Sequence, residues 1–132
     1  MKLKILPPTL RPNYRYLILD IKSEKPLSKN ELISAIWEAS IHLYGELEIS
    51  NFNLWLMRFF DGKDNIFKYE ENVNNFFYYK AVLRCQRNFE EKVRNSLTML
   101  YRYKGKKIAI STIGKSGTVK SAVNKFINPL NK

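Results

Sequence analysis

Two helix-start signals divide this chain into alternating segments, and they constrain its fold more than any other feature. Ser28 with Glu31 has the residue types and spacing of a capping box, in which each side chain accepts a backbone N–H bond from the other residue. The same pattern recurs at Asn88 with Glu91. We therefore expect two helices, each closed by a glycine: 28 to about 44 with Gly45, and 88 to about 103 with Gly105.

The other apolar segments alternate with a period of two, as strands do. They occupy four ranges: 14–21, 53–60, 76–85 and 108–113. The order strand, helix, strand, strand, helix, strand predicts an α+β fold of the ferredoxin-like or RRM-like βαββαβ type, with a four-stranded antiparallel sheet and two helices on one face. An apolar stripe in 118–128 predicts an extra C-terminal helix that covers the other face; its members are Val119, Ala122, Val123 and Phe126.

The phase of each alternation assigns side chains to the two faces of the sheet. In the first strand Leu17 and Ile18 face opposite ways, so this strand is expected to be buried on both sides. In the second strand, strict alternation places Arg58 on the side of Leu56 and away from Trp55.

At 132 residues the chain is expected to be a single domain. Residues 1–13 hold three of the five prolines and predict an extended N-terminal arm. Residues 61–75 predict a long loop between two strands. The carboxylates of this loop could be read as a metal site, but they follow no ordered spacing, so a solvated loop is favoured.

The net charge of +11 is large for a chain of this length, and it is unevenly distributed. Residues 1–30 carry seven Lys or Arg and two acids, residues 31–75 carry three and eight, and residues 76–132 carry thirteen and two. This separation favours a polyanion on one side of the domain and a neutral or basic partner on the other.

The stretch 107–120 combines a strand, the glycines Gly114 and Gly117, and the start of the last helix. We expect a sharp corner here whose backbone N–H groups and flanking lysines bind phosphate. A P-loop is excluded because Ala109 stands where that motif requires glycine. The GxxG of KH domains joins two helices, so that match is weak, and a plain strand-to-helix turn remains the alternative.

Base stacking on the sheet, as in RRM domains, is the less favoured mode of RNA recognition. Tyr78 and Tyr79 lie near the relevant strand, but the paired aromatics of that signature are absent from 80–85. The C-terminal helix would also cover the face. We therefore favour recognition of RNA backbone and shape.

Catalysis by the protein itself is not expected. The chain has one histidine, His42, and one cysteine, Cys85, which lies in a predicted strand. Neither supplies the acid–base pair or the metal ligands that a nuclease needs, so a stand-alone nuclease is the least favoured function. The single cysteine and the lack of an apolar leader predict a cytoplasmic protein.

The chain resembles a known family, archaeal ribonuclease P protein component two, along nearly its whole length. The most specific matches are the proline arm and the Ser-Gly-Thr segment. The matching residues are Leu6-Pro-Pro-Thr-Leu-Arg11, Arg15-Tyr16, Glu31, Ala35-Ile36-Trp37, Gly45-Glu46-Leu47, Trp55-Leu56, Leu83-Arg84, Arg87-Asn88, Arg94, Leu97-Thr98, Gly114, Ser116-Gly-Thr118 and Lys125-Phe126.

The resemblance implies a non-catalytic subunit of ribonuclease P, which removes the 5′ leader of precursor tRNA. The RNA subunit would be the catalyst and would use Mg²⁺, while the protein would bind no cofactor. The implied partners are that RNA, precursor tRNA and a TIM-barrel protein subunit, with two copies of each protein. A general RNA-binding or ribosome-associated protein is the alternative.

The candidate RNA-binding residues are basic side chains and members of the expected corner. They are Arg11, Arg15, Arg84, Arg87, Arg102, Lys106, Lys107, Gly114, Lys115, Ser116, Gly117, Thr118 and Lys120.

Overall fold

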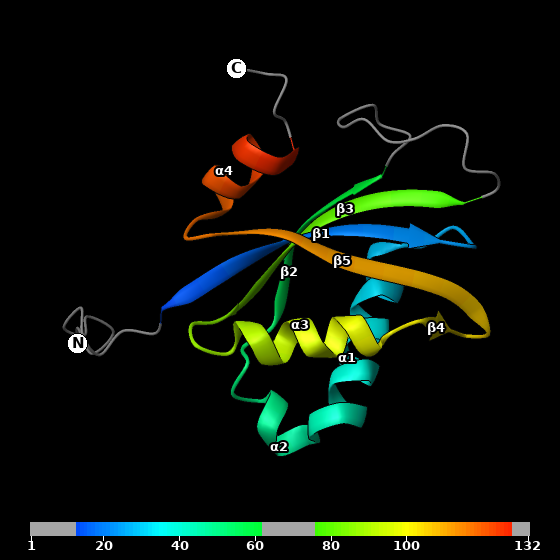
Figure 1. Cartoon of the computed structure of the whole chain (residues 1–132), viewed down its shortest axis with the longest axis horizontal. Coiled ribbons are helices and arrows are strands. Elements are labelled where there is room, and N and C mark those ends of the chain that lie inside the picture. The colour runs from blue at the N-terminus through cyan, green and yellow to red at the C-terminus, as the bar shows by residue number, and fades with distance from the viewer. Residues whose placement is uncertain (1–12, 62–75, 128–132) are drawn as a thin grey trace, which may run out of the picture.

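A computed structural model describes residues 13–61 and 76–127. The sheet has five strands in the order β2-β3-β1-β5-β4, and neighbouring strands are antiparallel (Figure 1). In chain order the elements are β1 (Tyr14–Ser23), α1 (Lys29–Tyr44), α2 (Glu46–Ile49), β2 (Trp55–Asp61), β3 (Phe77–Gln86), α3 (Glu90–Met99), β4 (Arg102–Tyr103), β5 (Lys106–Ser116), α4 (Val119–Ala122) and the π-helix η3 (Val123–Ile127).

The predicted count of four strands is wrong, because the segment expected to end the second helix is instead a strand. Helix α3 stops at Met99, and β4 pairs with β5. Lys104 and Gly105 connect the two strands, with φ values of 52° and 80°. Two successive left-handed residues form the tight turn that matches strand twist, so Gly105 belongs to a hairpin rather than to a helix end.

One of the two capping boxes is confirmed and the other is wrong. Ser28 N–H donates to Glu31 Oε1 over 2.9 Å, and Glu31 N–H donates to Ser28 Oγ over 3.2 Å. Asn88 instead has a left-handed φ of 77°, and its N–H donates to Glu90 Oε1 over 2.8 Å. Helix α3 therefore begins one residue later than expected, with Phe89 rather than Asn88 as N-cap.

Strand β1 is buried on both sides, as predicted. Leu17 belongs to the main core between the sheet and the helices α1 and α3, whereas Ile18 belongs to a second cluster with Ala122 and Ile127. Figure 1 shows α4 on the opposite side of the sheet from α1 and α3. We call the side with α1 and α3 the helix face and the side with α4 and η3 the C-terminal face.

Two β-bulges change which side chains reach each face. Met57 of β2 and Ile113 of β5 each have no opposing partner in the pairing register, so the alternation shifts by one residue after each of them. Arg58 consequently pairs with Val82, a member of the second cluster, and lies on the C-terminal face. The predicted placement of Arg58 beside Leu56 is therefore wrong.

Candidate nucleic-acid interface

Helices α1 and α2 differ in charge from the helical segment on the opposite side of the sheet. Helices α1 and α2 contain four glutamates and one lysine: Glu31, Glu38, Glu46, Glu48 and Lys29. The segment formed by α4 and η3 contains Lys120 and Lys125 and no acid. Because α1 and α2 lie on the other side of the sheet from α4, the charge separation in the sequence becomes a separation in space (Figure 1).

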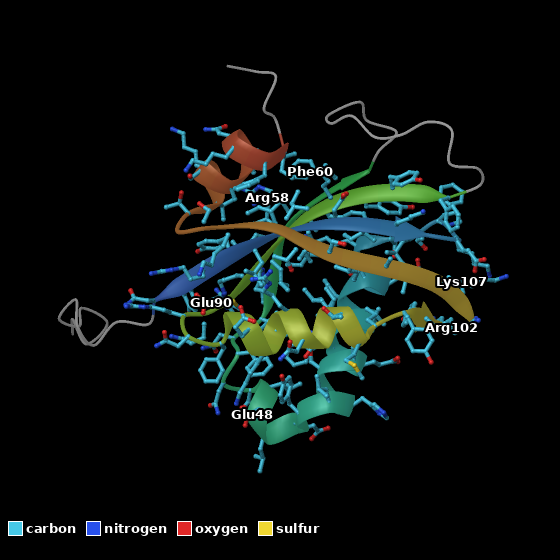
Figure 2. The ribbon with its side chains drawn as sticks, in the orientation of Figure 1. Glu48, Arg58, Phe60, Glu90, Arg102 and Lys107 are labelled. Atoms are coloured by element: carbon cyan, nitrogen blue, oxygen red, sulfur yellow. The ribbon has the colours of Figure 1, made fainter. Side chains whose placement is uncertain are left out.

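The basic residues around 107–120 do not gather at one point. Strand β5 is continuous from Lys106 to Ser116, so Lys107 and Lys115 lie about 27 Å apart at a rise of about 3.4 Å per residue. Arg102 pairs with Lys107 at the hairpin end. Figure 2 shows Arg102 and Lys107 at the end of β5 that is remote from α4.

A carboxylate offsets part of the charge at the hairpin end. Lys107 N–H donates to Glu24 Oε1 over 2.8 Å, and this bond lowers the pKa of the Glu24 carboxyl, with smaller contributions from the charges of Lys107, Lys106 and Arg102. The basic residues at the β4–β5 hairpin, Arg102, Lys106 and Lys107, are therefore less available to a polyanion than their number indicates.

The expected glycine corner at 114–117 is not present. Gly114 lies within β5 opposite Ile18, and the ring of Phe126 covers it so closely that a Cβ would stand 2.4 Å from ring carbons. A Cβ on Gly117 would meet nothing within 4 Å. Gly114 is thus required for close packing of η3, whereas no steric reason requires glycine at 117.

Side chains build the turn into α4, as the alternative of a plain strand-to-helix turn predicted. Thr118 is the N-cap, and its Oγ1 accepts the Ser121 N–H over 3.1 Å. Ser116 Oγ donates to the Thr118 carbonyl over 3.1 Å. Since α4 has only four residues, its dipole is small, and phosphate binding at 114–118 stays a prediction.

Lys115 and Lys120 lie on opposite faces of the sheet. The bulge at Ile113 turns Lys115 to the helix face, opposite Leu17, where its Nζ lies 3.8 Å from Glu90 Oε2. Lys120 belongs to α4 on the C-terminal face. The sequence pattern predicts that the two lysines serve one phosphate site. Their positions on opposite faces rule this out.

The remaining predicted arginines lie near the β5–α4 end of the sheet. Tyr16 pairs with both Ser116 and Arg84, which joins the end of β5 to β3. Arg15 is on the helix face opposite Cys85, and Arg87 is exposed just after β3. Arg11 lies outside the described residues.

Arg84 is the best-positioned of these arginines. Its guanidinium carbon lies 4.2 Å from the centre of the Tyr14 ring, and its Nε–H donates to the Asn53 carbonyl over 3.2 Å. Two contacts hold the guanidinium in place on the C-terminal face. Arg84 of β3 also lies opposite Trp55 of the neighbouring strand β2, and Trp55 is 62% exposed.

Sequence reasoning missed Trp55, Tyr14 and Arg58 as members of this surface. The sequence pattern identifies Trp55 and Tyr14 only as strand residues, and it predicts the wrong face for Arg58. The available signal was the aromatic and basic residues of two strands at matching positions. Their pairing became visible only with the register, which brings Trp55, Arg84, Tyr16 and Ser116 into one row across the sheet.

Tyr79, one of the two tyrosines near the strand expected to stack on bases, does not belong to that surface. Tyr79 is only 2% exposed, its hydroxyl accepts the Leu27 N–H over 2.8 Å, and its ring stacks on Phe59. It is a core residue on the helix face.

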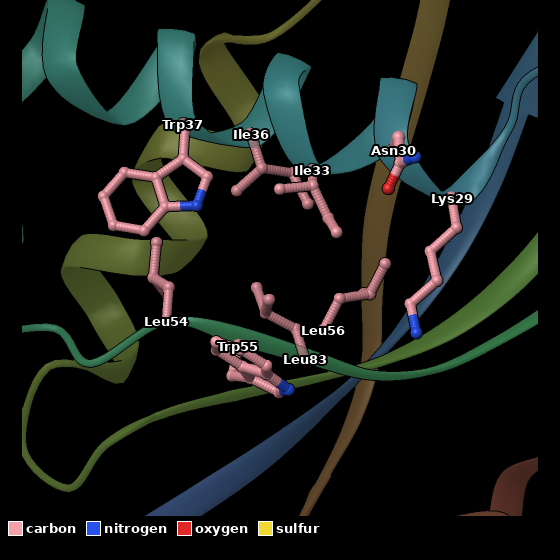
Figure 3. A pocket seen from close by; sticks show the side chains of 9 residues that line it. All are labelled: Lys29, Asn30, Ile33, Ile36, Trp37, Leu54, Trp55, Leu56 and Leu83. Carbon is pink, nitrogen blue, oxygen red and sulfur yellow. The ribbon is translucent and has the colours of Figure 1, made fainter.

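A groove of about 390 Å³ lies between α1 and β2 (Figure 3). Its lining is mostly apolar: Lys29, Asn30, Ile33, Ile36, Trp37, Leu54, Trp55, Leu56 and Leu83. Trp55 lies at its rim, and the indole is on the far side of β2 from Ile33 and Ile36 (Figure 3). An apolar lining does not fit a phosphate, so the groove is not itself a phosphate site, although Trp55 belongs both to its rim and to the basic surface.

Residues 13–61 and 76–127 contain no group of three His, Cys, Asp or Glu that could hold a metal ion. Burial raises the pKa of the Cys85 thiol to about 12, with a smaller contribution from Glu90, so this cysteine is a packed core residue rather than a nucleophile.

Within the described residues, no helix has the length and apolar character needed to cross a membrane.

Comparison with known proteins identifies the family. Residues 15–127 match the model of the Rpp14/Pop5 family. The chain is 46% identical to ribonuclease P protein component 2 of Methanobrevibacter smithii, over 96% of this chain and 98% of the relative. It is 42% identical to the protein of the same name from Methanothermobacter thermautotrophicus, over 98% of both, and 35% identical to that of Pyrococcus abyssi, over 97% and 96%. The resemblance found in the sequence is confirmed: the chain belongs to the Rpp14/Pop5 family.

Proposed function

We propose that this chain is a non-catalytic protein subunit of ribonuclease P that binds the RNA subunit through its C-terminal face. The observation that carries the proposal is the spatial separation of charge, with Arg58, Arg84 and Lys120 on one side of the sheet and the glutamates of α1 and α2 on the other. Phosphate contacts by Lys and Arg dominate RNA affinity and position a protein on its RNA.

The name of the relatives supports a place in the ribonucleoprotein that removes the 5′ leader of precursor tRNA. In this proposal the RNA is the catalyst and uses Mg²⁺, the protein binds no cofactor itself, and the particle is cytoplasmic. The acidic surface of α1 and α2 suits a protein rather than RNA, and we assign it to the TIM-barrel subunit, with two copies of each protein in the assembly. Precursor tRNA would be bound by the particle as a whole.

The arrangement of the sheet supports the expected ferredoxin-like class. Without the short hairpin strand β4, the strand order is β2-β3-β1-β5, with α1 and α3 on one face. We regard β4 as an addition to a βαββαβ domain and the segment of α4 and η3 as the element that closes its open face.

A general RNA-binding or ribosome-associated protein is the alternative, and the identity of the bound RNA separates the two. The full chain is purified from its native cells, and the RNA that copurifies is sequenced. We expect one dominant species with the features of ribonuclease P RNA. Ribosomal RNA or a broad mixture in its place would support the alternative. Cleavage of precursor tRNA by the protein without RNA would contradict the non-catalytic assignment.

A further inference from the structure

An exposed indole lies near two arginines on the C-terminal face. Trp55 is 62% exposed, although it belongs to a regular strand. Arg84 is its cross-strand partner, and the bulge at Met57 brings Arg58 to the same face three residues farther along β2. A bulge that redirects one side chain is a common way to assemble a functional surface.

Both arginines are held in place by contacts that leave most of their donors for a ligand. The Arg84 guanidinium stacks on Tyr14 and uses its Nε–H for the Asn53 carbonyl. Arg58 donates from Nη1 to the Met57 carbonyl over 2.9 Å. Each guanidinium has five N–H donors, so a single such bond leaves four.

The surroundings of Trp55 are positive. Arg58 lines a shallow hollow together with Lys120 of α4, and Figure 2 shows Arg58 beneath that helix. In the described strands, the carboxylate on this face that lies nearest in the register is Asp20, which lies 3.6 Å from Lys80. Lys80 neutralises the Asp20 carboxylate. Because Lys80 is four residues from Arg84 along β3, this pair is also remote from the Trp55 indole.

The C-terminal helices cover the middle of this face but leave its Trp55 end open. Met57 and Phe60 of β2 pack in the second cluster with Val123 and Phe126, whereas Trp55 does not. The predicted loss of every stacking position under the last helix is therefore only partly correct.

We propose that Trp55 stacks on the base of one unpaired nucleotide of RNA, while Arg84 and Arg58 contact the phosphates that flank it. This inference rests on the proposed function and specifies its ligand. A base within a duplex has both faces covered by its neighbours, so an exposed indole can stack only on a base from a loop, bulge or single strand. Such stacking depends little on which base is present. The flanking positive charges favour this ligand over an apolar protein segment.

The two tryptophans of the chain allow a direct test by fluorescence. Trp37→Phe leaves Trp55 as the only tryptophan, and Trp37 packs against the main core, where phenylalanine is a conservative replacement. The full-length variant is titrated with an eight-residue oligoadenylate carrying a 3′ fluorophore, and separately with a fully paired RNA duplex. Anisotropy of the label reports binding, and Trp55 emission reports stacking. We expect saturable quenching by the single strand and little quenching by the duplex.

Binding by Trp55 variants supplies the second measurement. Trp55→Ala should weaken binding of the oligoadenylate roughly 5- to 150-fold, whereas Trp55→Phe, which keeps a ring, should lose less. Arg94 is an exposed arginine of α3 on the helix face, away from Trp55. Arg94→Ala therefore serves as the control for a change on the other face and should alter the affinity for the oligoadenylate little.

Unquenched Trp55 emission at concentrations where anisotropy shows saturated, salt-dependent binding would overturn this inference and leave the proposed function intact. Absence of any RNA binding by the unmodified chain would overturn both the proposed function and this inference. Quenching of Trp55 only by the protein subunit of the same particle would assign the indole to a protein interface and would also contradict the inference.

Discussion

Gly114 of β5 lies directly beneath the ring of Phe126, and a Cβ at position 114 would stand 2.4 Å from ring carbons. This contact fixes η3, with its own Ile127, to the C-terminal face beside Ile18, and both isoleucines are fully buried. The glycine is needed for close approach of two elements rather than for its backbone freedom. The position of α4, and of Lys120 above Arg58, depends on this contact.

Gly114→Ala should destabilise the protein, because the new methyl group must displace the Phe126 ring. Overpacking of this kind costs about 1–3 kcal/mol. Urea denaturation followed by circular dichroism measures the loss. Gly117→Ala is the matched control and should change stability by less than about 0.5 kcal/mol, since a Cβ there meets nothing within 4 Å.

A double-mutant cycle checks that Phe126 is the cause. Combining Gly114→Ala with Phe126→Leu should cost less than the sum of the two single changes, because the smaller side chain makes room for the methyl group. Strict additivity would show that the strain arises elsewhere.

Lys120 and Lys115 should contribute differently to RNA binding. Lys120→Gln removes a charge from the C-terminal face and should reduce the slope of log affinity against log salt by about one. Lys115→Gln, on the helix face beside Glu90, should leave the slope unchanged. Equal effects of the two variants in filter-binding titrations would contradict the assignment of faces.

The Cys85 thiol should be inert in the native protein, since burial raises its pKa to about 12 and the thiolate is the reactive form. At pH 8, a disulfide reagent should label the chain only after denaturation. In the unfolded chain the pKa of the thiol is about 8.5. Above that pH the unfolded state binds fewer protons than the folded state, so the free energy of unfolding should fall as the pH rises. Rapid labelling of the native protein would show that this part of the core opens readily.

The acidic surface should serve a protein partner. Glu38→Lys with Glu46→Lys reverses two exposed charges on α1 and α2, and calorimetry with the proposed TIM-barrel partner should show weaker binding while RNA affinity is retained. Glu48 is left unchanged because it forms an ion pair with Lys92 of α3. Unchanged affinity for the subunit would mean that the glutamates only solvate the helices.

The sequence was sufficient wherever local pattern and tertiary packing agree. The Ser28 capping box, the burial of β1 on both sides and the packing of 119–127 on the open face follow from side-chain spacing alone. Each depends on interactions within one element or on a clear apolar stripe.

Apart from the capping box at Asn88, the errors fall where strand pairing decides the result. The bulges at Met57 and Ile113 exist only in the register with β3 and β1, and they move Arg58 and Lys115 to faces that strict alternation does not give. Lys104 has a left-handed backbone that its residue type does not signal, so the β4–β5 hairpin was read as the end of a helix. The candidate site was misplaced for the same reason, because its residues meet across strands.

The salt dependence of binding to ribonuclease P RNA tests the central claim most directly. The unmodified chain and the variant Arg58→Gln, Arg84→Gln, Lys120→Gln are titrated at a series of salt concentrations. If about six phosphates are contacted, the log–log slope of the unmodified chain should be roughly −5, and that of the variant should be about −3 or shallower. A slope near zero for the unmodified chain, or the same slope for both proteins, would contradict RNA binding through the C-terminal face.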